Sequence, residues 1–191
     1  MRKAIQTAKT KLVSGRHIIG WREKVALPEL GIVEIRGKID TGARTSALHA
    51  LDLKVEQHDG EDWVSFHVPH LGERRGIRHR AKVLDRRSIK NTGGVAEERY
   101  VIRTQIVIGR RKWQIELSLT DREKMKHDLI LGRTAIGRHR ILVAPDKSYL
   151  AGRPLASVPA ARESNMGSIE PQQPIRNRSQ VHLSAATGDD L

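Results

Sequence analysis

The sequence predicts an all-β domain, and three observations support the prediction. Between residues 18 and 150 the chain consists of short apolar-rich runs separated by turn residues, which is typical of strands. Residues 32–39 alternate apolar and polar side chains from Val33 onward, as a half-buried strand does. Residues 99–108 and 113–119 are β-prone runs joined by a glycine-containing turn, which indicates a β-hairpin.

Both ends of the chain are predicted to lie outside this domain. Residues 1–19 carry five basic residues and no acidic residue, and their apolar residues show little periodicity, so we expect a flexible basic arm. A transit-type presequence would also be basic, but such segments are rich in Arg and Ser and this one is poor in both. Residues 151–191 are rich in Pro, Ser, Gln, Asn and Gly and are expected to be a disordered tail. The folded domain is expected over residues 20–150.

The first half of the domain is predicted to contain two strands and a hairpin. Pro28 ends the first strand, because proline has no backbone N–H to donate. Asp59-Gly60 is a strong signal for a hairpin turn. Residues 45–53 fit either a turn or a further strand. The strands expected here are 18–27, 32–39 and the hairpin arms at 55 and 63–68.

The second half contains the densest charge run and a buried strand. Residues 74–90 hold eight basic residues against one acid, and the simplest interpretation is a solvated face. Residues 129–133 are apolar and end in Gly-Arg, as expected of a strand buried on both faces. The other expected elements are a flexible turn at 91–95, the hairpin of 99–119, a helical turn at 134–137 and a last strand at 141–145.

Composition narrows the possible functions. The 191 residues include no cysteine, which excludes disulfides, thiolate catalysis and Cys-ligated metals and fits a cytoplasmic protein. The net charge of +13 favours an anionic partner, whereas an aromatic content of 3% argues against a reader of single-stranded nucleic acid. The sequence contains no run of 18 apolar residues, so no membrane span is expected.

One acidic turn stands out as a candidate catalytic feature. Asp40-Thr41-Gly42-Ala43 directly follows the alternating strand of residues 32–39. Such a turn projects a carboxylate, its hydroxyl can bond nearby backbone, and its glycine permits another chain to approach closely. The same tripeptide occurs in ordinary turns, so a second feature is needed.

That second feature is Ile130-Leu131-Gly132-Arg133, and the two motifs together resemble the retropepsin-like aspartic peptidases. Residues 38–50 are similar to the signature of a bacterial family labelled putative ATP-dependent zinc proteases, now grouped with the retropepsin-like peptidases. The resemblance covers roughly residues 18–150. It implies a closed acid-protease barrel with one short helix, in which the Ile130–Arg133 strand supports the Asp40 turn.

The resemblance also implies a mechanism. Two carboxylates that share one proton can hydrolyse a peptide bond, one as base toward water and the other as acid toward the carbonyl oxygen. The sequence contains no second Asp-Thr/Ser-Gly, so Asp40 must come from each subunit of a homodimer. Thr41 would bond across the two-fold axis, Gly42 would permit the close approach, and Ala43 would border the substrate cleft.

Two further site assignments belong to the segment between the motifs. A hairpin flap is implied above the acid, and Gly93 and Gly94 are its candidate tip. Four arginines of the basic run are candidates for binding acidic substrate segments, which would suit the family's association with enzymes that add glutamate to proteins. These are Arg74, Arg75, Arg78 and Arg80.

No cofactor or metal is predicted. The segment Gly31 to Gly37-Lys38 has five intervening residues where a phosphate-binding loop has four, and Ile39 stands where such a loop has Ser or Thr. The sequence has no His-Glu-x-x-His, and His67, His70 and His79 are more simply surface or structural residues.

The sequence therefore predicts a cytoplasmic, homodimeric aspartic endopeptidase acting on a peptide or protein substrate. Two alternatives stay open: a dimeric retropepsin-like binding or regulatory module without turnover, and a basic nucleic-acid-binding protein using residues 1–19 and 74–90. The second alternative is disfavoured because no recognised nucleic-acid motif accompanies the charge.

Overall fold

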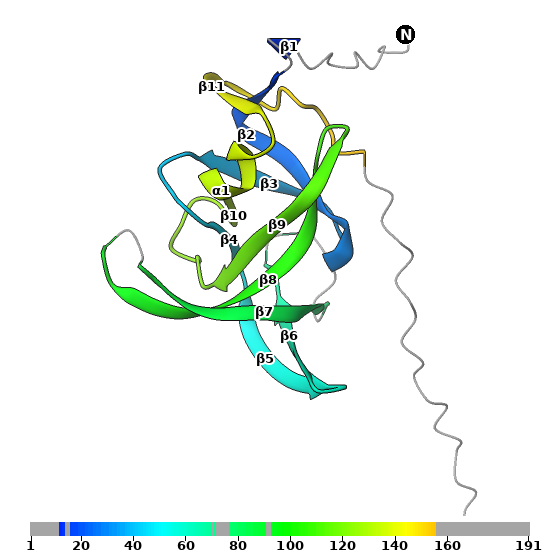
Figure 1. Cartoon of the computed structure of the whole chain (residues 1–191), viewed down its shortest axis with the longest axis vertical. Coiled ribbons are helices and arrows are strands. Elements are labelled where there is room, and N and C mark those ends of the chain that lie inside the picture. The colour runs from blue at the N-terminus through cyan, green and yellow to red at the C-terminus, as the bar shows by residue number, and fades with distance from the viewer. Residues whose placement is uncertain (1–11, 14–15, 70, 72–76, 91–92, 156–191) are drawn as a thin grey trace, which may run out of the picture. The chain divides into compact units, whose positions relative to one another are not determined.

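The protein is dominated by one eleven-stranded sheet, seen in a computed structural model that describes residues 12–13, 16–69, 71, 77–90 and 93–155. One short α-helix and one 3-10 turn accompany the sheet (Figure 1). The elements are β1 (Leu12–Val13), β2 (Arg16–Leu27), η1 (Pro28–Leu30), β3 (Ile32–Asp40), β4 (Ser46–His49), β5 (Leu51–His58), β6 (Glu61–His67), β7 (His79–Lys90), β8 (Ala96–Ile108), β9 (Arg111–Thr120), β10 (Leu129–Gly132), α1 (Arg133–Gly137) and β11 (Ile141–Ser148).

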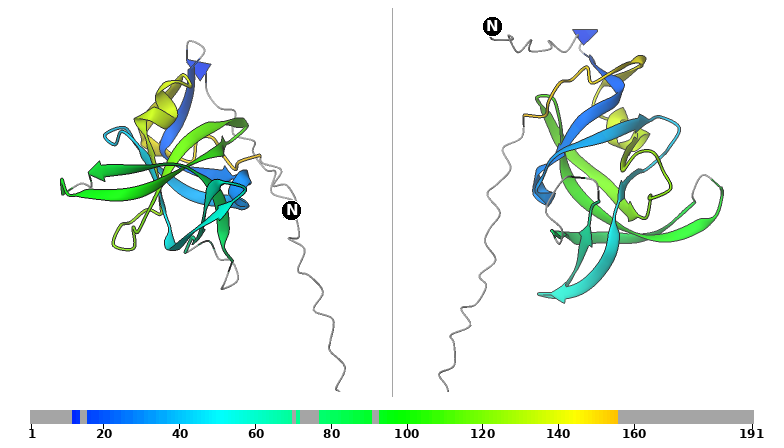
Figure 2. Two further views of the ribbon diagram at one scale, coloured as in Figure 1. Left: turned by 60° about the horizontal axis from the view of Figure 1, so that its bottom comes forward. Right: turned by 180° about the vertical axis from the view of Figure 1, so that it is seen from behind.

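Six of the strands close into a barrel. Their order is β2-β3-β10-β4-β9-β8, and the pairing of Val25 and Ala26 on β2 with Ile108 and Val107 on β8 completes the circle. The two views of Figure 2 show the strands wrapping around a common centre. The predicted closed β-barrel with one short helix is confirmed.

The alternation seen in the sequence of β3 places one set of side chains inside the barrel. Ile35 and Ile39 are each about 5% exposed and join a continuous apolar core. Arg36, Lys38 and Asp40 alternate with these residues and point to the outer face, because successive strand residues alternate sides. The catalytic candidate is therefore fixed by a strand whose other face is core.

The basic run of residues 74–90 contributes a long strand, which the sequence did not predict. Strand β7 pairs with β6 and β8, and its charged side chains point outward against acids from those and other strands. Arg87 contacts Glu116 on β9 at 2.5 Å, and Lys82 pairs with Glu61 on β6. Because these acidic partners are distant in the sequence, the basic run of residues 74–90 was interpreted as a solvated face.

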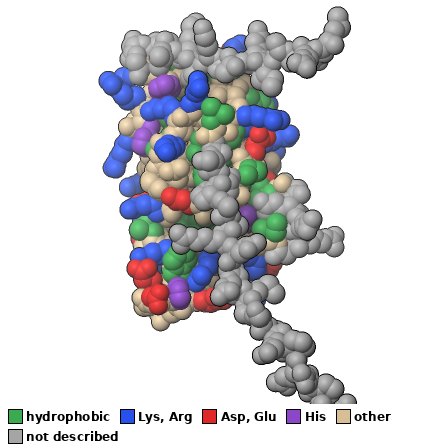
Figure 3. Space-filling view, turned by 90° about the vertical axis from the view of Figure 1, so that its right-hand side faces the viewer, with side chains coloured by type: hydrophobic (Ala, Val, Ile, Leu, Met, Phe, Trp, Pro, Cys, Tyr) green, Lys and Arg blue, Asp and Glu red, His purple; other side chains and the backbone are tan. Residues whose placement is uncertain are grey.

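The insert before β7 forms the predicted hairpin. Strands β5 and β6 are joined by Asp59 and Gly60, with φ of 52° and 74°, the left-handed conformation that a tight two-residue turn requires. On the face drawn in Figure 3, Lys and Arg side chains are spread from top to bottom, and Asp and Glu side chains are densest at the lower end.

The ends of the folded part differ slightly from the prediction. Strand β2 begins at Arg16, so the last four residues of the predicted arm belong to the sheet. Leu155 N–H donates to Gly109 O at 2.8 Å, which places the first residues of the predicted tail against the β8–β9 turn. Leu12 and Val13 of the arm form β1, and the rest of both predicted tails lies outside the described residues. Among the described residues, no helix is long and apolar enough to cross a membrane.

Candidate active site

The structure brings the two sequence motifs side by side. Asp40 is the last residue of β3, and in the parallel pairing with β10 it lies opposite Gly132, the last residue of that strand. Leu131 is fully buried and Ile130 is half-buried behind the turn. Arg133, predicted as part of the supporting strand, is instead the first residue of α1.

Gly132 permits a very close approach between the two segments. A Cβ at this position would lie 2.5 Å from the carbonyl oxygen of Thr45, so no other residue fits without moving the backbone. The N–H of Arg133 donates to Ala43 O at 2.9 Å, and that of Thr134 to Arg44 O at 3.2 Å. The Asp40 turn is therefore locked against the start of α1.

Backbone amides hold the Asp40 carboxylate. Its Oδ1 accepts the N–H of Gly42 and of Ala43, each at 3.2 Å. Thr41 and Gly42 are exposed and Ala43 is half-buried, so the outer edge of the turn faces solvent. This arrangement presents an oriented carboxylate that a second protein surface or a substrate can reach.

Lys38 occupies the other oxygen of this carboxylate. Its Nζ lies 3.1 Å from Asp40 Oδ2. Partial burial raises the pKa of Asp40, but the Lys38 ammonium group and the amides of Ala43 and Gly42 together outweigh it, so the pKa lies below its ordinary value of 3.8. Lys38 was not singled out in the sequence, although it stands two residues before Asp40 on the same face of a strand, which was the available signal.

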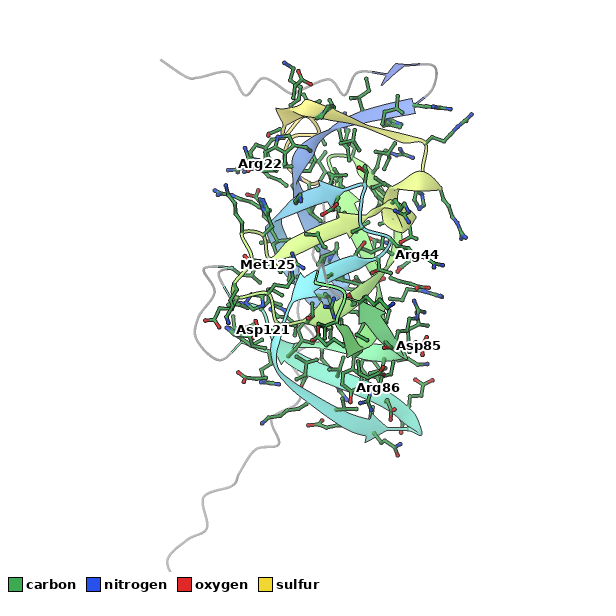
Figure 4. The ribbon with its side chains drawn as sticks, turned by 90° about the vertical axis from the view of Figure 1, so that its left-hand side faces the viewer. Arg22, Arg44, Asp85, Arg86, Asp121 and Met125 are labelled. Carbon is green, nitrogen blue, oxygen red and sulfur yellow. The ribbon has the colours of Figure 1, made fainter. Side chains whose placement is uncertain are left out.

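Further cations surround the turn. Arg133 Nη1 donates to Gly42 O at 3.2 Å, and the side chain of Arg44 is exposed. In Figure 4, Arg44 lies on one side of the central strands, and the loop that carries Asp121 and Met125 lies on the other. The Asp40 turn therefore sits in a positively charged environment.

The loop between β9 and β10 adds a half-buried arginine. Burial is the main cause that lowers the pKa of Arg122, and the charge of Arg99 lowers it further. The charges of Asp128 and Asp40 raise it, so the Arg122 guanidinium interacts electrostatically with the candidate acid. The N–H of Arg122 donates to Nδ1 of the fully buried His49 at 2.9 Å, which requires that nitrogen to be unprotonated. No sequence pattern predicted this arrangement, because it depends on how the loop folds.

The predicted flap tip falls at the end of the long β7–β8 hairpin. Gly93 and Gly94 lie in the turn between the strands, and Gly94 has a φ of 79°. Near the tip, Glu97 accepts hydrogen bonds from Arg99 at 2.7 Å and from Thr120 at 3.3 Å. Since Arg99 also acts on Arg122, this part of the hairpin lies close to the Asp40 environment.

The arginines proposed to bind acidic substrate take other positions. Arg78 donates to the carbonyl oxygens of Asp52 and Ser65 at 2.5 and 2.9 Å, and Arg80 lies over the ring of Trp63 at 4.7 Å. Both contact the β5–β6 hairpin, at the end of β7 opposite the flap tip. Arg74 and Arg75 lie outside the described residues.

A cavity of about 600 Å³ lies beside the middle of β3. Arg36 and Gly37 of β3 line it, together with Arg22 and Tyr149. His127 and Asp128, which precede β10, also line it. Its lining includes neither Lys38 nor Asp40, so the cavity is a separate hollow beside the same strand.

The described histidines do not assemble a metal centre. Nδ1 of the buried His79 lies 2.8 Å from Leu30 O and that of His67 lies 3.2 Å from Ile77 O, and both nitrogens must donate because a carbonyl only accepts. Within the described ranges no three His, Asp or Glu side chains are grouped closely enough to hold a metal ion. His70 lies outside those ranges.

Comparison with known proteins identifies relatives of the folded part. The sequence model of the RimB-like family, described as retropepsin-like aspartic endopeptidase RimB, matches residues 18–154. A probable alpha-L-glutamate ligase of Shewanella pealeana is 41% identical over 139 residues, which are 72% of this chain and 30% of the ligase. One from Parasynechococcus marenigrum is 44% identical over 138 residues, 71% of this chain and 29% of that protein. The chain thus spans about 30% of the length of these curated relatives.

A solved structure is also similar. The Legionella pneumophila protein Lpg0085, of unknown function, has a TM-score of 0.60 and 26% identity and aligns with 70% of this chain and 97% of its own. The family description names neither zinc nor ATP, so the zinc-protease label implied by the resemblance stays unconfirmed.

Proposed function

The chain belongs to the RimB-like family of retropepsin-like proteins. From this family membership, we propose that it is an aspartic endopeptidase in which two copies of Asp40 form the catalytic dyad. The observation that carries the proposal is the Asp40 carboxylate itself. It is oriented by the amides of Gly42 and Ala43, and its turn is exposed and locked against Gly132.

The dyad requires a second copy of the chain. Each subunit offers one Asp-Thr-Gly turn, so a two-fold axis beside Gly42 would bring the two carboxylates together. One carboxylate takes a proton from water while the other protonates the carbonyl oxygen of the peptide. Thr41 would bond across the axis, and Ala43 would border the cleft.

The β7–β8 hairpin is the element we propose as the flap. Its tip at Gly93 and Gly94 would close over an extended peptide, and the contacts of Glu97 with Arg99 and Thr120 would anchor it beside the site. Closure would exclude water and grip the substrate backbone.

We propose an acidic peptide or protein segment as substrate. Lys38, Arg44 and Arg133 place positive charge around the turn, and the relatives that share this domain are named probable glutamate ligases. Arg74 and Arg75 remain candidates for the same role. We propose no ligase activity for the chain, because it spans only about 30% of those relatives.

The test uses purified full-length protein and a library of acidic peptides over about pH 4–8. Asp40→Asn is expected to abolish cleavage, whereas Asp146→Asn, which alters an exposed Asp beside Lys147 on β11, should leave it intact. Adding excess Asp40→Asn protein to wild type should suppress activity, because mixed dimers hold half a dyad. Cleavage by the Asp40→Asn protein would refute the proposal.

A binding module without turnover is the second candidate, and the Lys38–Asp40 pair favours it. A carboxylate paired with an ammonium group tends to stay ionised, whereas a dyad needs one shared proton. Such a module would dimerise and bind the peptides without cleaving any of them at any pH.

A further inference from the structure

Both oxygens of the Asp40 carboxylate are held by donors within one subunit. Lys38 and Asp40 point to the same face of β3 because they are two residues apart, and Nζ lies 3.1 Å from Oδ2. Oδ1 accepts the amides of Gly42 and Ala43. Donors on both oxygens stabilise the ionised group and fix its orientation.

The surroundings of Lys38 favour this contact. Arg22 lies directly opposite Lys38 on β2, and its guanidinium is held over the Trp21 ring at 4.1 Å. His127, from the loop before β10, is close enough for Lys38 to lower its pKa, although burial is the larger cause. The cation Arg22 on the β2 side repels the ammonium group of Lys38 while Asp40 attracts it, so both forces favour the contact with Asp40.

Other charges face Asp40 from neighbouring elements. The β9–β10 loop contributes Arg122 and Asp128, and α1 contributes Arg133 through its bond to Gly42 O. The charges of Arg122 and Asp40 interact through space, and Asp128 acts on Arg122 in the same direction as Asp40. Lys38 differs from these groups because it forms a direct ion pair with the carboxylate.

Resting on the proposed function, we propose that Lys38 is a positioning residue of the reaction: its ammonium group orients the Asp40 carboxylate and sets the pH range in which the dyad holds its single proton. In the step that this favours, the ionised Asp40 takes a proton from water. The water oxygen bonds to the peptide carbonyl carbon, and the other Asp40 gives its proton to the carbonyl oxygen. Lys38 keeps its protons throughout.

The effect on a dyad follows from charge. Two adjacent carboxylates repel each other, which opposes the loss of the shared proton. A Lys38 from each subunit offsets that repulsion, so the singly protonated dyad is shifted to lower pH. Removing Lys38 should therefore move both limbs of the bell-shaped pH profile of kcat/KM upward.

The experiment compares Lys38→Met, Lys38→Arg and Lys147→Met with wild type. Methionine keeps an apolar stem without the charge, and arginine keeps the charge. Lys147→Met breaks a matched, exposed pair, in which Nζ lies 3.0 Å from Asp146 Oδ2. Far-UV circular dichroism establishes that each variant is folded. The readouts are the pH profile of peptide cleavage and, independently of turnover, the titration of the Asp40 carboxyl carbon by NMR.

We expect Lys38→Met to move the profile and the Asp40 titration upward by about one pH unit or more, with Lys38→Arg and Lys147→Met near wild type. Superimposable titrations of wild type and Lys38→Met would overturn the inference, as would an equal shift in Lys147→Met. If no variant cleaves any peptide but the Asp40 titration shifts as expected, the proposed activity fails while the role of Lys38 in holding the carboxylate stands.

Discussion

Asp40 and Gly132 lie opposite each other at the ends of the parallel strands β3 and β10, so one register joins the candidate acid to its supporting motif. The backbone around Thr45 passes directly over Gly132, and the Asp40 turn lies beside it. Any side chain at position 132 would therefore displace the segment that orients the carboxylate.

Gly132→Ala should consequently lower both stability and activity. Its Cβ would lie 2.5 Å from Thr45 O, and overpacking of this kind costs about 1–3 kcal/mol. Thermal unfolding should show a reduced Tm. Gly137→Ala is the matched control, because nothing lies within 4 Å of a Cβ at that position. Equal Tm values for the two variants would contradict the close approach.

Asp40 should stabilise the fold at neutral pH and lose that contribution in acid. The pKa of Asp40 is depressed below 3.8 despite partial burial, because Lys38 and two amides favour the charged form. A depressed carboxyl pKa gives stability that is present above the unfolded value and is lost as the pH falls through the folded value. Urea unfolding should show wild type losing its advantage over Asp40→Asn below about pH 4. An advantage that persists unchanged in acid would argue against the ion pair.

Glu23 should show the opposite pH dependence. Its side chain is fully buried, and burial raises its pKa above 4.5, although the amides of Gly20, Ala151 and Leu150 lower it in part. A raised folded pKa gives stability that is present below the unfolded value and is lost as the pH rises through the folded value. Glu23→Gln, which keeps an acceptor for Gly20 N–H, should therefore gain stability relative to wild type between about pH 4 and 8.

Urea midpoints measured across that range test the Glu23 prediction. Glu56→Gln, on the exposed strand β5, serves as the control. A constant difference between wild type and Glu23→Gln would show that the buried carboxyl does not change protonation on unfolding.

Local patterns were enough to predict part of this molecule. The alternation of β3 and the Asp59-Gly60 turn depend on neighbouring residues, so the sequence reveals them. Strand β7 escaped prediction because its basic residues are compensated by acids such as Glu116 that only the fold brings near. Arg122 was missed for the same reason, since its place beside Asp40 depends on the buried His49.

The proposed homodimer should associate more tightly as salt is added. Two carboxylates can meet only if the two Gly42 turns are adjacent, and Arg133 Nη1 lies 3.2 Å from Gly42 O in each copy. With Arg44 exposed nearby, the two copies bring like charges together at the axis. Salt screens such exposed charges, so the dimer Kd should fall between about 0.05 and 0.5 M NaCl. Sedimentation of Arg44→Gln should show tighter association than wild type at low salt, whereas Arg110→Gln, in the β8–β9 turn, should match wild type. A Kd that rises with salt, or that Arg44→Gln leaves unchanged, would place the dimer axis away from the Asp40 turn.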